Sequence, residues 1–155
     1  MAVAVAVFLA LAPSLRIDAA SPVTQNAADP VQAVLDAARS HLGAPYRYGG
    51  TGPRFDCSGL VFRVFEETGQ LSRIGGRRRT AAQLLRYFRA RGLASASDGR
   101  PGDLVIYNNG THVGVYLGDG EVISAINVGV RKHGLHRLTI PFTVFLHTHL
   151  ARMGT

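Results

Sequence analysis

Apolar side chains recur at helical spacing in three segments of the chain. The first segment extends from Asp29 to Gly43, and its Asp-Pro start is typical of a helix N-terminus. The second extends from Cys57 to Gly69 and the third from Thr80 to Gly92. All three end on a glycine, the residue that most often follows the last turn of a helix. The pattern therefore predicts three amphipathic helices.

From residue 104 onward the pattern changes to short apolar runs that are separated by turn residues. The runs cover residues 104–107, 112–117, 121–126 and 142–150. Asn-Asn-Gly and Gly-Asp-Gly sequences join the first three runs, as is usual between antiparallel neighbours. Helices followed by an antiparallel meander indicate an α+β domain in which the helices pack on one sheet.

The first dozen residues are almost purely alanine, valine, leucine and phenylalanine. This length matches the apolar region of a secretory signal and is short for a membrane span. No lysine or arginine precedes the run, so an uncleaved anchor is the alternative. We expect residues 1–20 to be a signal peptide or N-terminal apolar anchor, residues 21–29 a linker, and residues 30–152 one folded domain.

Charge changes this picture only slightly. The chain has 17 Lys and Arg residues against 10 Asp and Glu, which gives a net charge of +7. A solvated basic surface is the favoured interpretation, because no basic stripe with interleaved aromatic residues and no nucleic-acid motif is present. We therefore expect no nucleic-acid partner. The run Arg77-Arg78-Arg79 is interpreted in the same way, as a solvated loop before the third helix.

Cys57 is the only cysteine, so no disulfide can form within the chain. Free cysteines are often buried for packing alone. Cys57, however, stands where a polar loop gives way to the second predicted helix, and a helix N-terminus favours the thiolate. The position predicts a nucleophile rather than a core residue.

A cysteine nucleophile needs a base, and the chain has six histidines. His112 begins a predicted strand after a tight turn, at the rim of a sheet that a helix must cover, so it is the candidate partner of Cys57. The other five are interpreted as structural or solvated: His41 ends a helix, His133 and His136 lie in a basic loop, and His147 and His149 alternate on the last strand.

Rival chemistries find little support in these residues. The histidines form no compact set of metal ligands, and one cysteine is too few for the common zinc sites. A Gly-x-Ser-x-Gly elbow does not occur, and the glycine run at 49–52 lacks the lysine of a phosphate loop. We expect neither a metal nor an organic cofactor.

Five short motifs occur in order along the domain. They are G-A-P-Y-R-Y-G-G at 43–50, D-C-S-G-L-V at 56–61, R-T-A-A-Q at 79–83, P-G-D-L-V at 101–105 and H-V-G-V-Y-L-G at 112–118. Together they resemble the NlpC family of bacterial cell-wall (peptidoglycan) cysteine endopeptidases, which belongs to the papain-like superfamily. The resemblance covers roughly residues 31–150.

The resemblance implies a minimal papain-like fold and hydrolysis of an amide bond in peptidoglycan stem peptides. In this family the bond usually joins the side-chain carboxyl of D-glutamate to a diamino acid. Cys57 would be the nucleophile, His112 the general base and then the acid, and Tyr46 would help to hold the oxyanion beside the Cys57 amide. Asp56 and Ser58 would line the substrate side and recognise a free stem-peptide amine.

Such an enzyme would be secreted or would reside in the cell envelope of a bacterium, with membrane contact only through its N-terminal segment. A monomer is favoured. Two simpler interpretations stay open for the site residues. Tyr46 could be a core aromatic residue, and Asp56 could be a helix cap, a role that is compatible with substrate binding.

One position departs from the family pattern. Where the family usually has histidine, asparagine or glutamine, on the strand after that of His112, this chain has Ser124. A serine hydroxyl can accept a hydrogen bond from imidazole Nδ1–H, but it is short and uncharged and would orient the ring less firmly. Asn127 would lie on the opposite face of that strand. The alternatives are a weakly active or non-catalytic wall-binding module, and a papain-like amidase or acyltransferase with another substrate.

Overall fold

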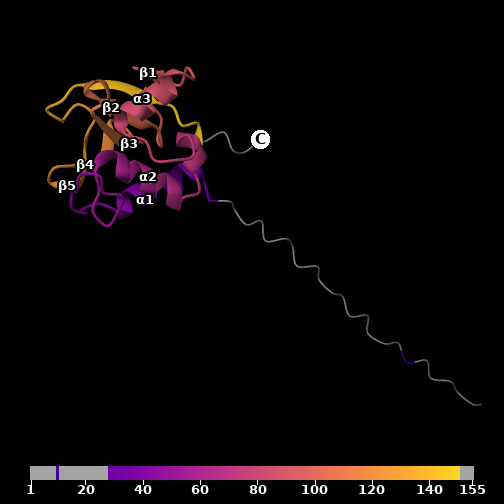
Figure 1. The fold of residues 1–155 in the computed structure, drawn as a ribbon. Helices are drawn as coiled ribbons and strands as arrows, with labels where there is room; N and C mark the ends of the chain where they lie inside the picture. The colour runs from indigo at the N-terminus through magenta and orange to yellow at the C-terminus, as the bar shows by residue number, and fades with distance from the viewer. Residues whose placement is uncertain (1–9, 11–27, 151–155) are drawn as a thin grey trace, which may run out of the picture.

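The computed structural model describes residues 28–150 together with residue 10 (Figure 1). The expected signal peptide or anchor and most of the expected linker lie outside the described residues, so both stay predictions. Within the described part of the chain, no helix is long and apolar enough to cross a membrane.

Three α-helices occur among residues 28–150: α1 (Pro30–Ser40), α2 (Cys57–Glu67) and α3 (Ala81–Arg89). Two short 3-10 turns, η1 (Leu71–Ile74) and η2 (Asn108–Gly110), lie between the larger elements. Side chains cap the first turn of every α-helix, where the backbone amides have no intrahelical acceptor. The caps are Asp29, Asp56 and Thr80, the last in a capping box with Gln83. The three predicted helices are confirmed.

The described residues also form a six-stranded antiparallel sheet in the order β1-β6-β2-β3-β4-β5. Its strands are β1 (Ala94–Ser95), β2 (Leu104–Tyr107), β3 (His112–Gly118), β4 (Glu121–Ile126), β5 (Gly129–Gly134) and β6 (Phe142–Leu146). The sequence pattern missed both edge strands and extended the last strand too far. The reason is local: β1 has two residues, and β5 has Val130 as its one apolar side chain, so neither shows the alternation of a half-buried strand.

Alternate residues of the central strands belong to two separate cores. Leu104 and Ile106 pack with the three helices on one face of the sheet. Val105 and Tyr107 point to the other face, where side chains between residues 135 and 142 cover them. This alternation follows from the two-residue period of a strand. The fold is therefore α+β, with helices on one face of an antiparallel sheet, as predicted.

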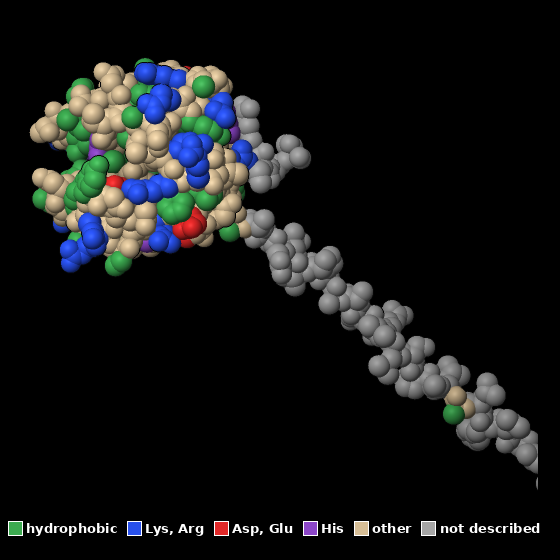
Figure 2. Space-filling model, in the orientation of Figure 1, with side chains coloured by type: hydrophobic (Ala, Val, Ile, Leu, Met, Phe, Trp, Pro, Cys, Tyr) green, Lys and Arg blue, Asp and Glu red, His purple; other side chains and the backbone are tan. Residues whose placement is uncertain are grey.

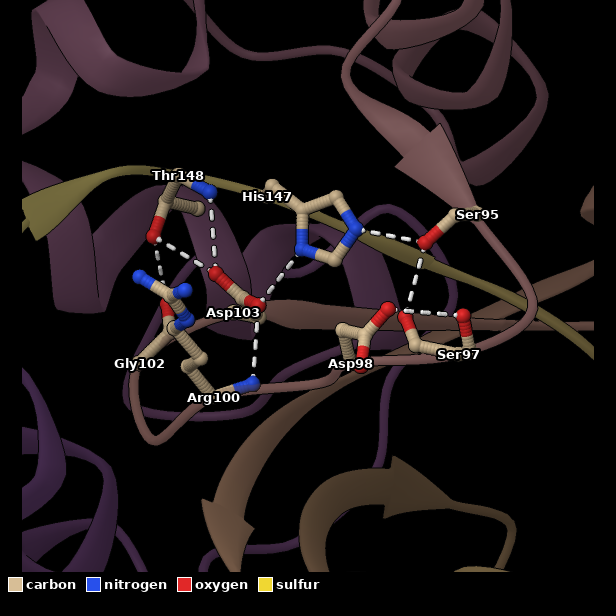
Figure 3. A network of polar contacts seen from close by, with 8 residues as sticks. All are labelled: Ser95, Ser97, Asp98, Arg100, Gly102, Asp103, His147 and Thr148. Carbon is tan, nitrogen blue, oxygen red and sulfur yellow. Dashed lines mark hydrogen bonds and ion pairs between the residues drawn. The ribbon is translucent and has the colours of Figure 1, made fainter.

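Asp103 joins three segments of the chain at one end of β2 (Figure 3). Its carboxylate accepts hydrogen bonds from the backbone amides of Arg100 (2.9 Å) and Thr148 (3.0 Å) and from Nδ1 of His147 (2.9 Å). His147 Nε2 lies 2.7 Å from Oγ of Ser95 on β1. The network holds the chain after β6 against the β1 edge of the sheet.

Candidate active site

Cys57 is the first residue of α2, and Asp56 is its N-cap. The thiol is partly exposed and lies next to the start of β3, where the Val113 backbone amide donates a hydrogen bond to it. Burial raises the pKa of the Cys57 thiol, and the amides of Val113, Ser58 and Cys57 itself only partly oppose that rise. The helix N-terminus therefore does not by itself produce the thiolate that the sequence suggested, and Cys57 needs a base.

His112 is the first residue of β3 and directly precedes Val113, whose amide reaches the thiol. Burial, together with the charge of His133, lowers the pKa of His112 to about 4. The ring is thus a neutral imidazole at neutral pH, able to accept a proton. The structure brings Cys57 and His112 to the same junction between α2 and β3, as a neutral thiol and a neutral base.

Ser124 is completely buried on β4, and its hydroxyl lies between two histidine rings. His112 Nε2 lies 3.0 Å from Ser124 Oγ, and His133 Nε2 lies 2.7 Å from the same oxygen. Ser124 thus contacts Nε2 of His112 rather than the expected Nδ1. His133 lies on β5 instead of in a basic loop, and its Nδ1 is 3.0 Å from the Gly134 carbonyl oxygen. Only the position of His133 within a charged segment could have signalled it, and that signal is weak.

Tyr46 lies in the loop that precedes α2, and its side chain is 37% exposed, so it is not a core aromatic residue. Burial of the hydroxyl and the nearby Cys57 raise the pKa of Tyr46. The loop lies directly on the first turn of α2, because a methyl group at Gly59 would overlap the Gly50 carbonyl oxygen. Glycine at position 59 therefore permits the approach that brings Tyr46 beside the thiol.

Asp56 has its carboxylate surrounded by donors. The amides of Gly49 and Gly59 donate to it at 2.8 and 2.6 Å, Ser58 Oγ lies 3.3 Å away, and Arg78 binds both of its oxygens at 2.9 and 3.0 Å. Asp56 is therefore a helix cap, as one interpretation of the sequence held. Arg78, expected in a solvated loop, instead forms an ion pair next to the nucleophile.

Two adjacent hollows form a groove that crosses the site. One, of about 530 Å³, is lined by Cys57, Asp56 and Arg78 among others. The other, of about 560 Å³, contains His112 and Asn127, and Tyr46 lines both. Asn127 follows the end of β4 and lines the same hollow as His112. The thiol lines one hollow and the imidazole the other, with Tyr46 between them.

Basic side chains are spread over the face shown in Figure 2 and are not gathered into a stripe. Among the residues that the structure describes, no three His, Cys, Asp or Glu side chains are grouped so that they could hold a metal ion. The groove is lined by the Cys57 thiol, the His112 imidazole, the Tyr46 phenol and the Asp56–Arg78 pair.

Comparison with known proteins adds a family to this geometry. Residues 43–139, more than half of the chain, match the model of the NlpC/P60 family. A probable endopeptidase of Corynebacterium glutamicum (Cgl2188) is 42% identical over 114 residues, which is 72% of this chain and 50% of that protein. The probable endopeptidase p60 of Listeria innocua is 39% identical over 108 residues, 67% of this chain and 21% of that protein. The chain thus spans half or less of the length of these relatives.

Solved structures of the same family are similar to this chain. The peptidoglycan hydrolase RipB of Mycobacterium tuberculosis is 26% identical with a TM-score of 0.61, over 77% of this chain and 64% of that one. The NlpC/p60 domain of the peptidoglycan hydrolase SagA is 25% identical with a TM-score of 0.57, over 75% of this chain and 97% of that domain. Helices, sheet, motifs and family match all agree, and the chain belongs to the NlpC/P60 family.

Proposed function

We propose that this chain is a cysteine endopeptidase that hydrolyses an amide bond in peptidoglycan stem peptides, between the γ-carboxyl of D-glutamate and a diamino acid. One observation carries the proposal: the Cys57 thiol contacts Val113, the neighbour of a half-buried, neutral His112 imidazole, and the two groups line adjoining hollows. The names of its relatives supply the substrate class. The protein would act outside the cytoplasm or in the bacterial envelope, and would contact the membrane only through residues 1–20.

Acylation begins with a proton transfer. His112 takes the thiol proton of Cys57, and the thiolate attacks the carbonyl carbon of the stem peptide. The Cys57 amide and the Tyr46 hydroxyl hold the oxyanion that forms. His112 then returns the proton to the leaving amine of the diamino acid, and a thioester between Cys57 and the glutamyl group remains.

Deacylation uses the same residues, with water in place of the thiol as the nucleophile. His112 removes a proton from a water molecule that attacks the thioester carbonyl, and the second oxyanion collapses with release of the Cys57 thiol and a free carboxyl group. Because the resting pair is neutral, the imidazole must act as a base in each half-reaction.

Substrate recognition involves Asp56 and Ser58 on the first turn of α2. A free stem-peptide amine would meet the Asp56 carboxylate, but Arg78 already occupies both of its oxygens. The amine must displace Arg78 or bind beside it at Ser58. Arg78 would then be left to pair with a carboxylate of the same stem peptide.

The test is incubation of the full chain with purified peptidoglycan, followed by mass analysis of the released fragments. Wild type is expected to release fragments with a new free amine on the diamino acid, and the Cys57→Ala variant is expected to release none. Identical fragment profiles for the two proteins would sink the hydrolase proposal. Sedimentation of both with the wall would then show whether binding alone is the activity.

A further inference from the structure

Three side chains form a continuous chain of contacts behind the candidate base. His112 Nε2 lies 3.0 Å from Ser124 Oγ, Ser124 Oγ lies 2.7 Å from His133 Nε2, and His133 Nδ1 lies 3.0 Å from the Gly134 carbonyl oxygen. The three residues come from three neighbouring strands, β3, β4 and β5. We propose that His133 is a positioning residue that acts through Ser124 to fix the tautomer and orientation of His112. The inference rests on the proposed hydrolase function.

The direction of each hydrogen bond follows from the last contact in the series, that between His133 and the Gly134 carbonyl oxygen. A backbone carbonyl can only accept, so His133 must donate to Gly134 from Nδ1–H. Burial lowers the pKa of His133, and a neutral imidazole has a single N–H, so its Nε2 can only accept. The one proton of the Ser124 hydroxyl therefore points to His133. Ser124 Oγ is left to accept from His112.

The consequence for His112 is a single tautomer. Its Nε2 carries the proton and donates to Ser124, so Nδ1 keeps the lone pair that a base requires. A lone serine could not ensure this, because a hydroxyl donates to one tautomer of the ring as readily as it accepts from the other. His133 removes that ambiguity. A short, uncharged residue at position 124 is thus sufficient to fix the His112 tautomer when His133 contacts it from the other side.

The fold provides the space and the packing that this chain of contacts needs. Val122 pairs with His133 and Ser124 with Arg131, so Ser124 and His133 are diagonal neighbours on one face of the sheet. Gly114 on β3 leaves room beside Ser124, because a methyl group there would lie 3.0 Å from the Ser124 Cβ. The Tyr107 ring lies 5.7 Å from the His112 ring and 6.2 Å from that of His133. Both imidazoles are thus held against one aromatic surface.

The experiment compares wild type with His133→Ala, Ser124→Ala and the double variant, with His136→Ala as the control. His136 packs edge-on against Phe142 and takes no part in the chain of contacts. Nitrogen-15 NMR reports which ring nitrogen of His112 carries the proton, without any substrate. Wild type is expected to show Nε2–H, and His133→Ala is expected to lose that preference while His136→Ala keeps it.

Kinetics on peptidoglycan fragments give the second measurement. Without His133, kcat should fall about 10- to 100-fold with KM nearly unchanged, less than the roughly ten-thousand-fold loss when a serine-protease triad loses its orienting carboxylate. Because His133 acts through Ser124, the double variant should be no slower than the slower single variant. His133→Gln, whose amide oxygen can accept from Ser124, should recover part of the loss.

Several results would overturn the inference. One is an unchanged His112 tautomer together with an unchanged kcat in His133→Ala; another is additive losses in the double variant. A loss that follows the melting temperature of each variant, with no change of tautomer, would mean that His133 is only structural. If wild type released no fragments, the proposed function would fail, and the tautomer measurement would still decide the role of His133.

Discussion

Two clusters of histidine and serine side chains lie toward opposite edges of the same sheet. Toward the β5 edge, His112 contacts Ser124, which in turn contacts His133. Toward the β1 edge, His147 contacts Ser95 through Nε2 and Asp103 through Nδ1 (Figure 3). The second set contains a serine, a histidine and a buried carboxylate at hydrogen-bond distances, yet the first is the one beside the thiol.

The two clusters differ in whether the histidine has a ring nitrogen without a protein partner, available to a substrate. Both nitrogens of His147 have protein partners, and Ser95 Oγ also lies 2.7 Å from the Ser97 carbonyl oxygen. That arrangement holds backbone segments together and leaves no nitrogen for a substrate. Among the residues that the structure describes, His112 has a hydrogen-bond partner at Nε2 only, which leaves Nδ1 for the proton of Cys57. The ring nitrogen that His112 has left for a substrate, rather than resemblance to a triad, distinguishes the candidate base from the structural histidine.

The largest expected effect separates the two histidines by activity. His112→Ala should lower the rate of fragment release by about 100- to 10,000-fold, the usual contribution of a general acid–base group. His147→Ala should leave the kcat of the folded protein unchanged, because His147 lies outside the groove. Rates are measured on peptidoglycan fragments with both variants corrected for the folded fraction. Equal losses would erase the distinction.

Asp103→Asn should have the opposite effect to His112→Ala: the protein should lose stability and keep most of its activity. The Asp103 carboxylate is nearly fully buried and accepts from two amides and an imidazole, whereas an asparagine NH₂ group would face one of these donors. The free energy of unfolding should fall by about 1–3 kcal/mol in urea denaturation. Asp119→Asn, in an exposed turn at positive φ that asparagine tolerates, is the matched control. Equal stability of the two variants would contradict the assignment.

Ser124→His tests whether the Ser124–His133 pair has replaced a larger residue. Because Ser124 is buried and the His133 ring lies 2.7 Å from its hydroxyl, a second imidazole does not fit beside His133. Overpacking should lower the free energy of unfolding by about 1–3 kcal/mol and displace the His112 ring, so turnover should fall as well. In the His133→Ala background the same substitution has space and should restore part of the rate. A faster Ser124→His variant in the wild-type background would show that the serine site is merely poorly oriented.

The smallest expected effect is on pH dependence. The His112 pKa lies near 4 in the folded protein against about 6.5 in the unfolded chain, and that of His133 is also lowered. The folded state therefore binds fewer protons than the unfolded state, and stability falls as the pH decreases from about 6.5 toward 4. Melting temperatures measured across this interval should fall less steeply in His112→Gln than in wild type.

The acid limb of the activity profile should follow the same ring. It should lie closer to pH 4 than to the value of free imidazole, because His112 stays neutral there. His133 and Tyr107 lie near this ring, and Arg137 lines the same hollow. Removal of His133 takes away a charge that lowers the His112 pKa, so His133→Ala should move the limb to higher pH. A limb that stayed in place would exclude that coupling.

Local signals in the sequence were sufficient for the helices and for the position of Cys57. Caps and terminal glycines are read over three or four residues, and the apolar stripe that begins at Cys57 belongs to one continuous segment. The runs that became β2, β3 and β4 were predicted for the same reason, since each shows its apolar character within its own few residues.

The contacts that define the site depended on tertiary structure. Arg78 reaches Asp56 across 22 residues of sequence, and His133 reaches Ser124 only because β5 pairs with β4 in one register. A charged edge strand such as β5 has no apolar alternation to reveal it. A shift of one residue would turn its side chains to the other face of the sheet.

The sequence by itself thus determined which residue is the candidate nucleophile and which histidine begins the neighbouring strand. It also determined the order of the three helices and of the strands β2, β3 and β4. Tertiary structure alone decided the state of the thiol, because burial at the junction of α2 and β3 raises its pKa against the effect of the helix N-terminus. Tertiary structure also decided that His133 contacts Ser124. Hydrogen bonds between side chains on separate strands are set by strand register and packing, which no single segment of the chain encodes.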